Sequence, residues 1–203
     1  MTEPKQTERR TKTALLNDVY QAALVLGNEL GYNRITFSEI SKRANVTRAT
    51  LYRHWQSPFG LLYAAVQYYS ESHPNQVQPS DFEQQSLRQN LITALMRFES
   101  SFRSVPNPDS FMAYFVSEIV KDVPENREIL AELKTTNRYY MNLIIDVALA
   151  KQELQQRPSD FLLNLPMETL IYQMGVNHQR ISEKLVTMIV DQMLIPTFES
   201  QAK

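Results

Sequence analysis

Residues 36–55 have the sequence TFSEISKRANVTRATLYRHW, which predicts two short helices joined by a tight turn. The first helix has a start signal, because Thr36 is a favourable N-cap and Glu39 can bond back to the amide of that cap. Its apolar residues recur at the three- and four-residue spacing that places side chains on one face. These residues are Phe37, Ile40 and Ala44. The stretch therefore predicts a short amphipathic helix with a defined beginning.

The turn and the second helix follow directly. Asn45 falls where the chain needs a positive φ, which asparagine tolerates better than most residues other than glycine. Val46 fills the corner between the helices, and Thr47 can cap the second helix. Leu51 and Trp55 are four residues apart, so they share the inward face of that helix with Val46. The outer face of the second helix is left polar and basic.

This outer face carries side chains of the types that contact DNA. A short second helix set across a first one can lie in a major groove, with its N-terminal residues at the base edges. Arginine bonds guanine through two hydrogen bonds, and alanine or the threonine methyl packs on a thymine methyl. The side chains in position for base edges are Arg48, Ala49 and Thr50, and those better placed for phosphates are Tyr52, Arg53 and His54. With the two helix caps, the predicted DNA-binding set is Thr36, Thr47, Arg48, Ala49, Thr50, Tyr52, Arg53 and His54.

Spacing and capping alone also fit any helical hairpin with a solvated outer face. The sequence is more specific than that, because residues 24–62 resemble the N-terminal domain of the tetracycline-repressor-like (TetR/AcrR) transcription regulators. The matching pieces are Leu30-Gly31-Tyr32, Ile35-Thr36, Glu39-Ile40, residues 44–47 and, above all, residues 50–55 (TLYRHW). Two positions depart from the family pattern. Asn45 replaces the usual turn glycine, and Pro58 stands where many relatives have a phosphate-binding lysine.

The resemblance implies an all-α protein with an N-terminal three-helix helix-turn-helix domain, followed by a helical bundle for effector binding and dimerisation. It implies a sequence-specific transcription regulator, a homodimeric repressor that a small molecule releases from a palindromic operator. The expected partners are therefore double-stranded DNA with a near-palindromic operator, a small-molecule effector and a second copy of the chain. The expected domains are a flexible tail at 1–10, the DNA-binding domain at 11–56 and the regulatory domain at 57–203.

Composition agrees with an all-helical, DNA-binding chain. Only 4 glycines occur in 203 residues, and runs with strand-like alternation are scarce. Residues 1–56 contain nine Lys and Arg against five Asp and Glu, whereas residues 57–203 contain twelve against seventeen. The part of the chain with the motif is thus the positively charged part. Positive charge favours DNA binding, because basic residues that bind phosphates release counterions.

Composition also disfavours several other classes of protein. The chain has no cysteine, so it has no disulfide framework or thiol nucleophile, which suits the reducing cytosol. No apolar run is long enough to span a bilayer, and the N-terminus lacks the apolar stretch of a signal peptide. We therefore expect a cytoplasmic protein with no membrane partner. The histidines at 54, 73 and 178 are scattered, and no nucleophile elbow is present, so no metal, cofactor or catalysis is expected.

Hydrophobic spacing and loop signals predict further helices on both sides of the motif. The expected helical ranges are 13–30, 58–71, 80–104, 109–121, 124–155, 167–178 and 182–198, with loops at 73–79 and 158–166. The last two helices are the expected dimer contact, since they carry an apolar row and a mid-helix glycine that permits close helix approach. The predicted dimer residues are Ile171, Tyr172, Gly175, Leu185, Ile189 and Met193. Packing within one copy of the chain is the alternative for each of them.

Aromatic and methionine side chains are dense in the middle helices, as in the walls of ligand cavities in helical bundles. The predicted effector-binding residues are Phe98, Phe102, Met112, Tyr114, Phe115, Tyr139, Asn142 and Asp146. Core packing or solvated surface is the alternative for each residue. A mostly apolar lining would suit an uncharged or hydrophobic ligand.

Three hypotheses for function follow from these patterns. The first is the ligand-responsive homodimeric repressor. The second keeps the DNA-binding unit but gives the helical bundle a protein partner, as a ligand-independent adaptor. The third is a helical-bundle enzyme or carrier, which lacks a catalytic constellation and does not explain the basic N-terminal part.

Overall fold

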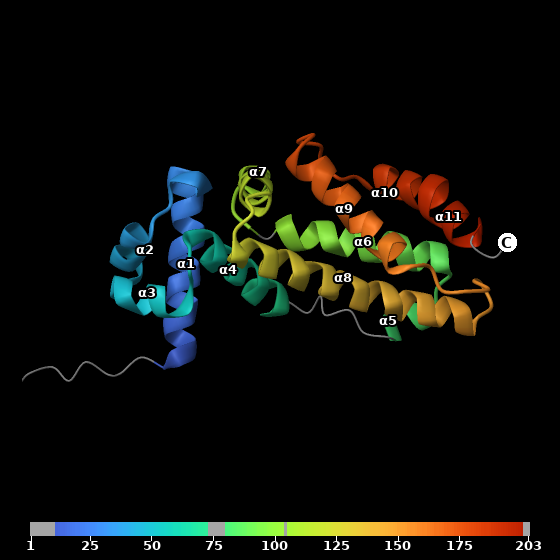
Figure 1. Cartoon of the computed structure of the whole chain (residues 1–203), viewed down its shortest axis with the longest axis horizontal. Helices are drawn as coiled ribbons and strands as arrows, with labels where there is room; N and C mark the ends of the chain where they lie inside the picture. The colour runs from blue at the N-terminus through green and yellow to red at the C-terminus, as the bar shows by residue number, and fades with distance from the viewer. Residues whose placement is uncertain (1–10, 73–79, 104, 201–203) are drawn as a thin grey trace, which may run out of the picture. The chain divides into compact units, whose positions relative to one another are not determined.

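The structure is a computed structural model, and it describes residues 11–72, 80–103 and 105–200. Every regular element within these ranges is a helix (Figure 1), which confirms the expected all-α class. The chain divides into two compact units, residues 1–65 and 66–203, with the boundary inside α4 (Pro58–Ser72). The tail at 1–10 and the loop at 73–79, both predicted from sequence, lie outside the described residues.

The first unit begins with α1 (Lys12–Leu30), in which Thr11 is the N-cap and accepts a hydrogen bond from the amide of Ala14 at 3.2 Å. Gly31 ends α1 with φ of 89°, a backbone conformation that favours glycine. A short 3₁₀ helix (Tyr32–Arg34) follows. The motif then forms α2 (Phe37–Ala44) and α3 (Arg48–His54), and α4 begins at Pro58.

Tyr32 and Gly27 fit together in the core of the first unit. The side chain of Tyr32 is 1 % exposed, and a Cβ at Gly27 would lie only 2.1 Å from its Cε1 atom. A glycine at position 27, in the last turn of α1, is therefore required by the ring that packs on it. The same burial raises the pKa of the Tyr32 hydroxyl to about 12.

The second unit is a bundle built around a long central helix. Its elements are α5 (Ser80–Glu83), α6 (Leu87–Arg103), α7 (Pro108–Ile119), α8 (Pro124–Ala150), α9 (Asp160–Gly175), α10 (Glu183–Ile189), the π-helix η2 (Val190–Leu194) and α11 (Ile195–Ser200). The central helix α8 contacts α5, α6, α7 and α9 (Figure 1), and α6 also contacts α10 and η2.

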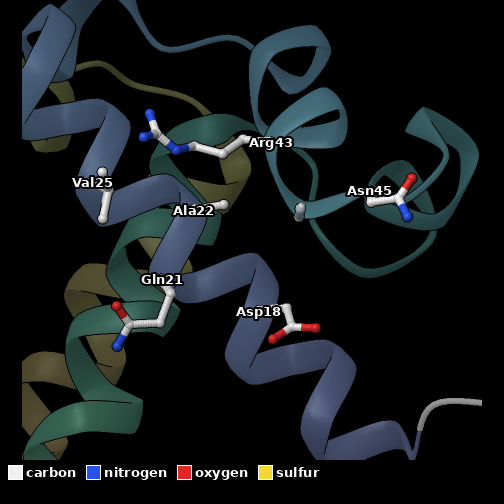
Figure 2. Close-up of a pocket in the computed structure, with 7 residues that line it drawn as sticks. Asp18, Gln21, Ala22, Val25, Arg43 and Asn45 are labelled. Atoms are coloured by element: carbon white, nitrogen blue, oxygen red, sulfur yellow. The ribbon is translucent and has the colours of Figure 1, made fainter.

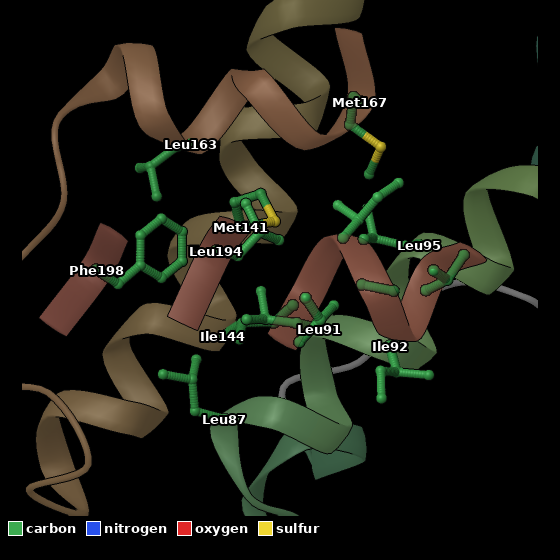
Figure 3. Packing of buried hydrophobic residues seen from close by; sticks show 14 of the residues in the cluster. Leu87, Leu91, Ile92, Leu95, Met141, Ile144, Leu163, Met167, Leu194 and Phe198 are labelled. Carbon is green, nitrogen blue, oxygen red and sulfur yellow. The ribbon is translucent and has the colours of Figure 1, made fainter. Parts of the chain in front are cut away.

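The core of this unit is drawn from helices that are far apart in the sequence. Figure 3 shows Leu91 and Leu95 of α6 packed with Met141 and Ile144 of α8, together with Phe198 of α11. All five side chains are at most 1 % exposed. This buried apolar surface holds the helices together, because each square ångström removed from water contributes roughly 25 cal/mol.

Three predicted helix boundaries in this unit were wrong. The helix expected at 80–104 is broken after Glu83, where the Asn90 amide donates to the carbonyl of Phe82 at 2.8 Å and stabilises the break. The helix expected at 124–155 ends at Ala150, and Gln152 takes a positive φ of 61°. The loop expected at 158–166 is mostly helix, because α9 begins at Asp160.

Proline occurs inside two helices of this unit. Pro166 lies inside α9, although it cannot donate a backbone hydrogen bond there. It is buried between Leu163 and Met167, so tertiary packing outweighs its helix-breaking tendency. The helix expected at 182–198 contains a π turn directly before Pro196, and the amide of Ile195 donates to the carbonyl of Val190, five residues back.

None of the helices in the described ranges is long and apolar enough to cross a membrane.

Replacing Gly27 with alanine is expected to destabilise the first unit, because the new Cβ displaces the Tyr32 ring. Overpacking of this kind costs about 1–3 kcal/mol of the free energy of unfolding. Urea denaturation followed by circular dichroism measures the loss. Asn28→Ala, at an exposed position of the same helix, is the control and should change the free energy by less than about 0.5 kcal/mol. Equal effects of the two variants would contradict the packing argument.

Candidate DNA-binding surface and ligand-site residues

The start of α2 is a complete capping box, as the sequence predicts. The Thr36 hydroxyl accepts a hydrogen bond from the amide of Glu39 at 3.3 Å, and the Thr36 amide donates to Glu39 Oε2 at 2.9 Å. Two amides at the helix end are therefore satisfied by side chains. The buried face carries the three predicted apolar residues, Phe37, Ile40 and Ala44.

The turn between α2 and α3 has the predicted left-handed residue. Asn45 has φ of 52° and ψ of 51°, and the amide of Val46 donates to the carbonyl of Ser41 at 3.0 Å. Ser41 is buried, and its small side chain leaves room for the chain to reverse. Because the turn is closed by backbone bonds, the direction of α3 is fixed relative to α2.

Helix α3 has a cap at its start and an apolar anchor at its centre. The Thr47 hydroxyl accepts from the amide of Thr50 at 3.1 Å, and the two threonine hydroxyls lie 2.9 Å apart. Leu51 is fully buried. Trp55 is half-buried at the C-terminal end, with its ring centroid 5.7 Å from that of Tyr20 on α1. These contacts hold one side of α3 against the rest of the unit.

The opposite side of α3 faces solvent. Arg48, Ala49, Arg53 and His54 are exposed, and Thr50 is half-buried. Tyr52 is 64 % exposed, yet its ring packs edge-on against Phe37 with centroids 4.8 Å apart. The structure therefore brings six of the eight predicted DNA-binding residues onto one short helix, with Thr47 as its cap and Thr36 at the start of α2.

The cations near α3 differ in how they are paired. Arg43 of α2 binds Glu29 of α1 through both terminal guanidinium nitrogens, which links these helices. The hydrogen bond from Arg43 lowers the pKa of the Glu29 carboxyl below its ordinary value. Arg48 and Arg53 form no ion pair with any other residue of the described ranges. Their charges remain available to an external anion.

A hollow of about 370 Å³ lies beside the C-terminal end of α2, and Figure 2 shows side chains that line it. The residues that line it are Asp18, Gln21, Ala22, Val25, Arg43, Ala44 and Asn45. It is open to solvent, and its Arg43 side chain is already bound to Glu29. We assign it no ligand.

The predicted effector-binding residues fall into two groups. The first group is packed together on α6 and α7, where the ring centroids of Phe98 and Phe102 are 5.1 Å apart and those of Phe102 and Phe115 are 6.4 Å apart. Met112 is also buried, and Tyr114 is half-buried. Burial raises the pKa of the Tyr114 hydroxyl, with smaller contributions from the charges of Glu118 and Glu125.

The second group lies on the outer side of α8. Tyr139 is 60 % exposed. Asn142 accepts a hydrogen bond from Arg157 at 2.6 Å, and Asp146 forms an ion pair with the same arginine. These three residues do not join the aromatic group, and the two polar ones anchor the segment that follows α8. They lie one helical turn apart, a spacing that sequence reasoning could not distinguish from a buried row.

Two further hollows in the second unit share a wall on α6. They measure about 600 and 430 Å³, and both are bordered by Glu99 and Arg103. Glu99 is 5 % exposed, and Arg103 forms an ion pair with it through Nε. None of the eight predicted effector-binding residues lines either hollow.

The predicted dimer residues are also divided. Leu185 and Ile189 belong to the buried core of one copy, which is the alternative interpretation of that row. Gly175 is buried where a Cβ would lie 2.2 Å from Val116 Cγ2 of α7, so its partner helix is intramolecular. Tyr172 is 53 % exposed, whereas Ile171 and Met193 are half-buried.

Other apolar side chains are exposed on the same helices, and the sequence reasoning did not select them. Phe161 of α9 is 69 % exposed, Val176 directly after α9 is 46 % exposed, and Met188 of α10 is 45 % exposed. The spacing from Phe161 to Tyr172 is eleven residues and from Tyr172 to Val176 four, so the three follow one face of α9 and its C-cap. This spacing was visible in the sequence, but the loop wrongly expected at 158–166 concealed its first member.

The tetR family of bacterial regulatory proteins provides a family model that matches residues 19–65. These residues include all of α2 and α3 and the turn between them. Residues 19–65 therefore form a domain of the tetR family, the DNA-binding helix-turn-helix domain of a transcription regulator.

Solved structures of tetR-family and fatty-acid regulators share the fold of the chain. A TetR regulator from Rhodococcus sp. RHA1 is 20% identical, with 93% of this chain and 99% of that chain covered and a TM-score of 0.62. The regulator FadR from Bacillus subtilis, solved in complex with stearoyl-CoA, is 15% identical, with 88% and 97% covered and a TM-score of 0.64. The fatty acid degradation regulator FadR from Bacillus halodurans is 14% identical, with 93% and 97% covered and a TM-score of 0.58. A comparison with curated protein sequences finds no significant match.

Within the described residues, no group of three or more His, Asp or Glu side chains is arranged to hold a metal ion.

Replacing Asn45 with alanine is expected to weaken the turn between α2 and α3. Residues other than glycine and asparagine are strained at positive φ. The cost is about 1 kcal/mol in the free energy of unfolding. Glycine at the same position is the matched control and should leave this free energy unchanged or slightly higher. Urea denaturation measures the free energy of unfolding of both variants. Equal values for the two would show that the left-handed geometry of Asn45 does not contribute to stability.

Proposed function

We propose that this tetR-family regulator is a homodimeric repressor that binds a near-palindromic operator and leaves it when a small molecule binds the helical unit. As a regulator of bacterial genes it acts in the cytoplasm, where the chromosome lies. The observation that carries the proposal is the outer face of α3, which is exposed and basic while its inner face is anchored by Leu51.

Base recognition falls to the first turn of α3. Arg48 is exposed and has no ion-pair partner among the described residues, so its guanidinium can bind guanine O6 and N7. Such a bidentate contact discriminates by about 1–3 kcal/mol against other bases. The hydroxyl of Thr50 is within hydrogen-bond distance of Thr47, so we assign its methyl group, with that of Ala49, to thymine methyls.

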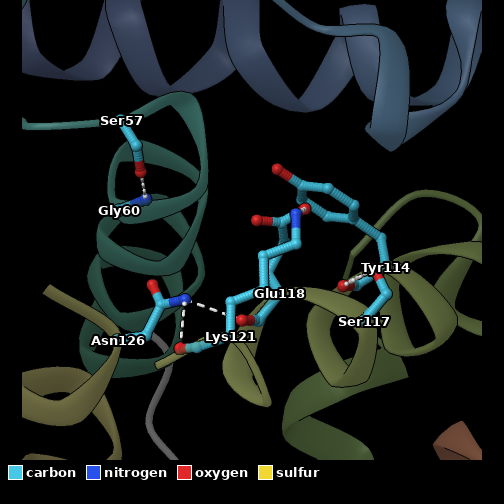
Figure 4. A network of polar contacts seen from close by, with 7 residues as sticks. All are labelled: Ser57, Gly60, Tyr114, Ser117, Glu118, Lys121 and Asn126. Atoms are coloured by element: carbon cyan, nitrogen blue, oxygen red, sulfur yellow. Dashed lines mark hydrogen bonds and ion pairs between the residues drawn. The ribbon is translucent and has the colours of Figure 1, made fainter. Parts of the chain in front are cut away.

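Phosphate contacts come from the flanks of the motif. Tyr52, Arg53 and His54 are exposed along α3, and the N-terminus of α2 at Thr36 adds backbone amides. At the start of α4 the Ser57 hydroxyl accepts from the amide of Gly60 at 3.0 Å (Figure 4), so this helix is capped although Pro58 offers no lysine charge. These contacts fix the register on the duplex and carry little sequence information.

Dimerisation is proposed through exposed apolar side chains on α9, directly after it, and on α10. Single exposed apolar side chains are ordinary on protein surfaces, but a row of them indicates a contact surface. This surface comprises Phe161, Tyr172, Val176 and Met188. A two-fold dimer carries two α3 helices, as two half-sites roughly 34–36 Å apart require.

Effector control is proposed for the helical unit. The regulator from Bacillus subtilis was solved with stearoyl-CoA, so a bundle of this fold accommodates a long apolar ligand in that protein. We propose two forms of the dimer that differ in the spacing of their α3 helices. A ligand that binds one form more tightly would shift the equilibrium toward that form, and its difference in affinity sets the size of the shift. If no ligand alters DNA binding, the ligand-independent adaptor becomes the better hypothesis.

The DNA-binding assignment predicts two distinguishable mutant effects. After selection of bound duplexes from a random pool, Arg48→Ala should lower the preference for the selected base pair by about 1–3 kcal/mol. Tyr52→Phe should weaken binding to all duplexes alike, because it removes a phosphate contact. Fluorescence anisotropy at fixed salt measures both effects. Tyr139→Phe on α8 is the control. An Arg48→Ala variant that keeps the full base preference would show that Arg48 does not recognise bases.

The dimer assignment predicts that a charge in the exposed apolar face separates the two copies. Tyr172→Glu combined with Met188→Glu should convert the dimer to a monomer, because the carboxylates would be desolvated without a partner charge. Sedimentation velocity measures the mass. Tyr139→Glu alters an equally exposed aromatic side chain of α8 and should leave the dimer intact. A double variant that remains dimeric, or a parent chain that is monomeric, would refute this interface.

A further inference from the structure

The two hollows on α6 share a buried charge. Glu99 is the one charged side chain that is buried within the described residues, at 5 % exposed, and it borders both hollows. A carboxylate that is removed from water needs a positive partner, because its desolvation is otherwise uncompensated. Arg103 supplies that partner through Nε. This place therefore combines a buried anion with space for another molecule beside it, and a few placed polar groups are what give a ligand site its selectivity.

Arg103 is a partner that can leave. Its side chain is 39 % exposed, whereas that of Glu99 is 6 % exposed. The arginine head can return to water while its stem stays on the protein, but the carboxylate stays at the wall of the hollows. Removing Arg103 without a replacement would leave a buried charge unpaired. A second cation in the same place would remove that penalty.

The larger hollow provides room for an apolar group beside Glu99. It measures about 600 Å³, and Ile92 and Met96 border it. These two residues precede Glu99 by seven and three positions, so all three lie along one face of α6. Helix α10 contacts α6 (Figure 1) and contributes Glu183 to the same hollow. An apolar chain along Ile92 and Met96 would thus bring a charged end to Glu99.

The other charges at the two borders favour a cation in the larger hollow. There Arg97 is already bound to Asp81 at 2.8 Å, whereas Glu183 adds a second acidic side chain. The smaller hollow differs, because Asp109 and Arg180 border it with charges of both signs. Apart from the arginine that holds Glu99, the larger hollow therefore has an acidic border.

We infer that the larger hollow binds the effector, and that the effector is an organic cation with an apolar body. The inference rests on the proposed function and specifies the site and the chemistry of its ligand. The cationic group replaces Arg103 on the Glu99 carboxylate, so the buried anion is paired with and without ligand. The apolar body lies along Ile92 and Met96, and its removal from water supplies the affinity.

Replacement of Arg103 also bears on the proposed dimer surface. The guanidinium of Arg103 donates to the carbonyl of Ile181 at 3.4 Å, in the segment between α9 and α10. Val176 precedes this segment and Met188 follows it, and both belong to the proposed dimer surface. A ligand that takes the place of Arg103 removes a bond between α6 and the segment that connects these two contacts.

Three probes with the same alkyl chain and different head groups test the inference. Octylammonium is positively charged, 1-octanol is neutral and octanoate is negatively charged. Isothermal titration calorimetry with the full-length protein should show that octylammonium binds about tenfold more tightly than 1-octanol, because it alone forms a charge-assisted bond with Glu99. Octanoate should bind most weakly. Octylammonium should also reduce the affinity of the protein for the selected operator.

Three variants separate the charge of Glu99 from the shape of the hollow. Glu99→Gln keeps the size of the side chain, so it should weaken octylammonium about tenfold and leave 1-octanol unchanged. Glu183→Gln removes an exposed acid from the same hollow and is the matched control, with a change of about twofold at most. Arg103→Gln removes the competing cation, so octylammonium should bind it more tightly than the parent. Glu99→Gln tests the same contact if Arg103→Gln is too unstable to purify.

The outcomes separate the inference from the proposed function. Equal octylammonium affinity of the parent and Glu99→Gln proteins would overturn the site, and so would equal weakening of octylammonium and 1-octanol, which indicates a purely structural ion pair. Tighter binding of octanoate, or no binding of octylammonium, would overturn the cationic ligand class. Unchanged operator affinity at saturating octylammonium would overturn the effector role. Failure of the parent protein to select any duplex would instead refute the proposed function.

Discussion

The orientation of α3 depends on one turn, in which Asn45 holds a left-handed backbone conformation and the Val46 amide closes onto Ser41. The turn directs Leu51 into the core and thereby leaves Arg48 and Tyr52 outside. Because every residue of α3 is placed by this reversal, a change in its backbone would rotate the DNA-contacting face. The capping bonds at Thr36 and Thr47 reinforce the same geometry by fixing where each helix begins.

The sequence predicted the first unit well because its signals are local. Capping boxes, a positive-φ residue and a four-residue apolar spacing act over one or two turns of chain, and each was found where expected. The second unit has fewer such signals. Pro166 lies in the range where the sequence predicts a loop, but the packing of Leu163 and Met167 keeps α9 continuous through it. That stabilisation comes from helices distant in sequence, so no local pattern reports it.

Site residues in the second unit were also hard to predict from local sequence patterns. Leu185 and Tyr172 both lie on predicted apolar helix faces, yet the first is buried in the core and the second is exposed. Periodicity identifies a face but does not show what covers it.

The two units also differ in how they use charge, and this difference bears on how DNA is approached. Basic residues of the second unit are largely engaged in ion pairs, as in Arg88 with Asp191 and Arg97 with Asp81. Residues 57–203 carry seventeen acidic against twelve basic side chains, so this part of the chain repels phosphates. The unpaired Arg48 and Arg53 lie in the positive part. A field of opposite sign on the two units favours encounters in which α3 meets the duplex first. This long-range attraction weakens as added salt shortens the Debye length. The contacts of α3 with base edges depend less on salt concentration.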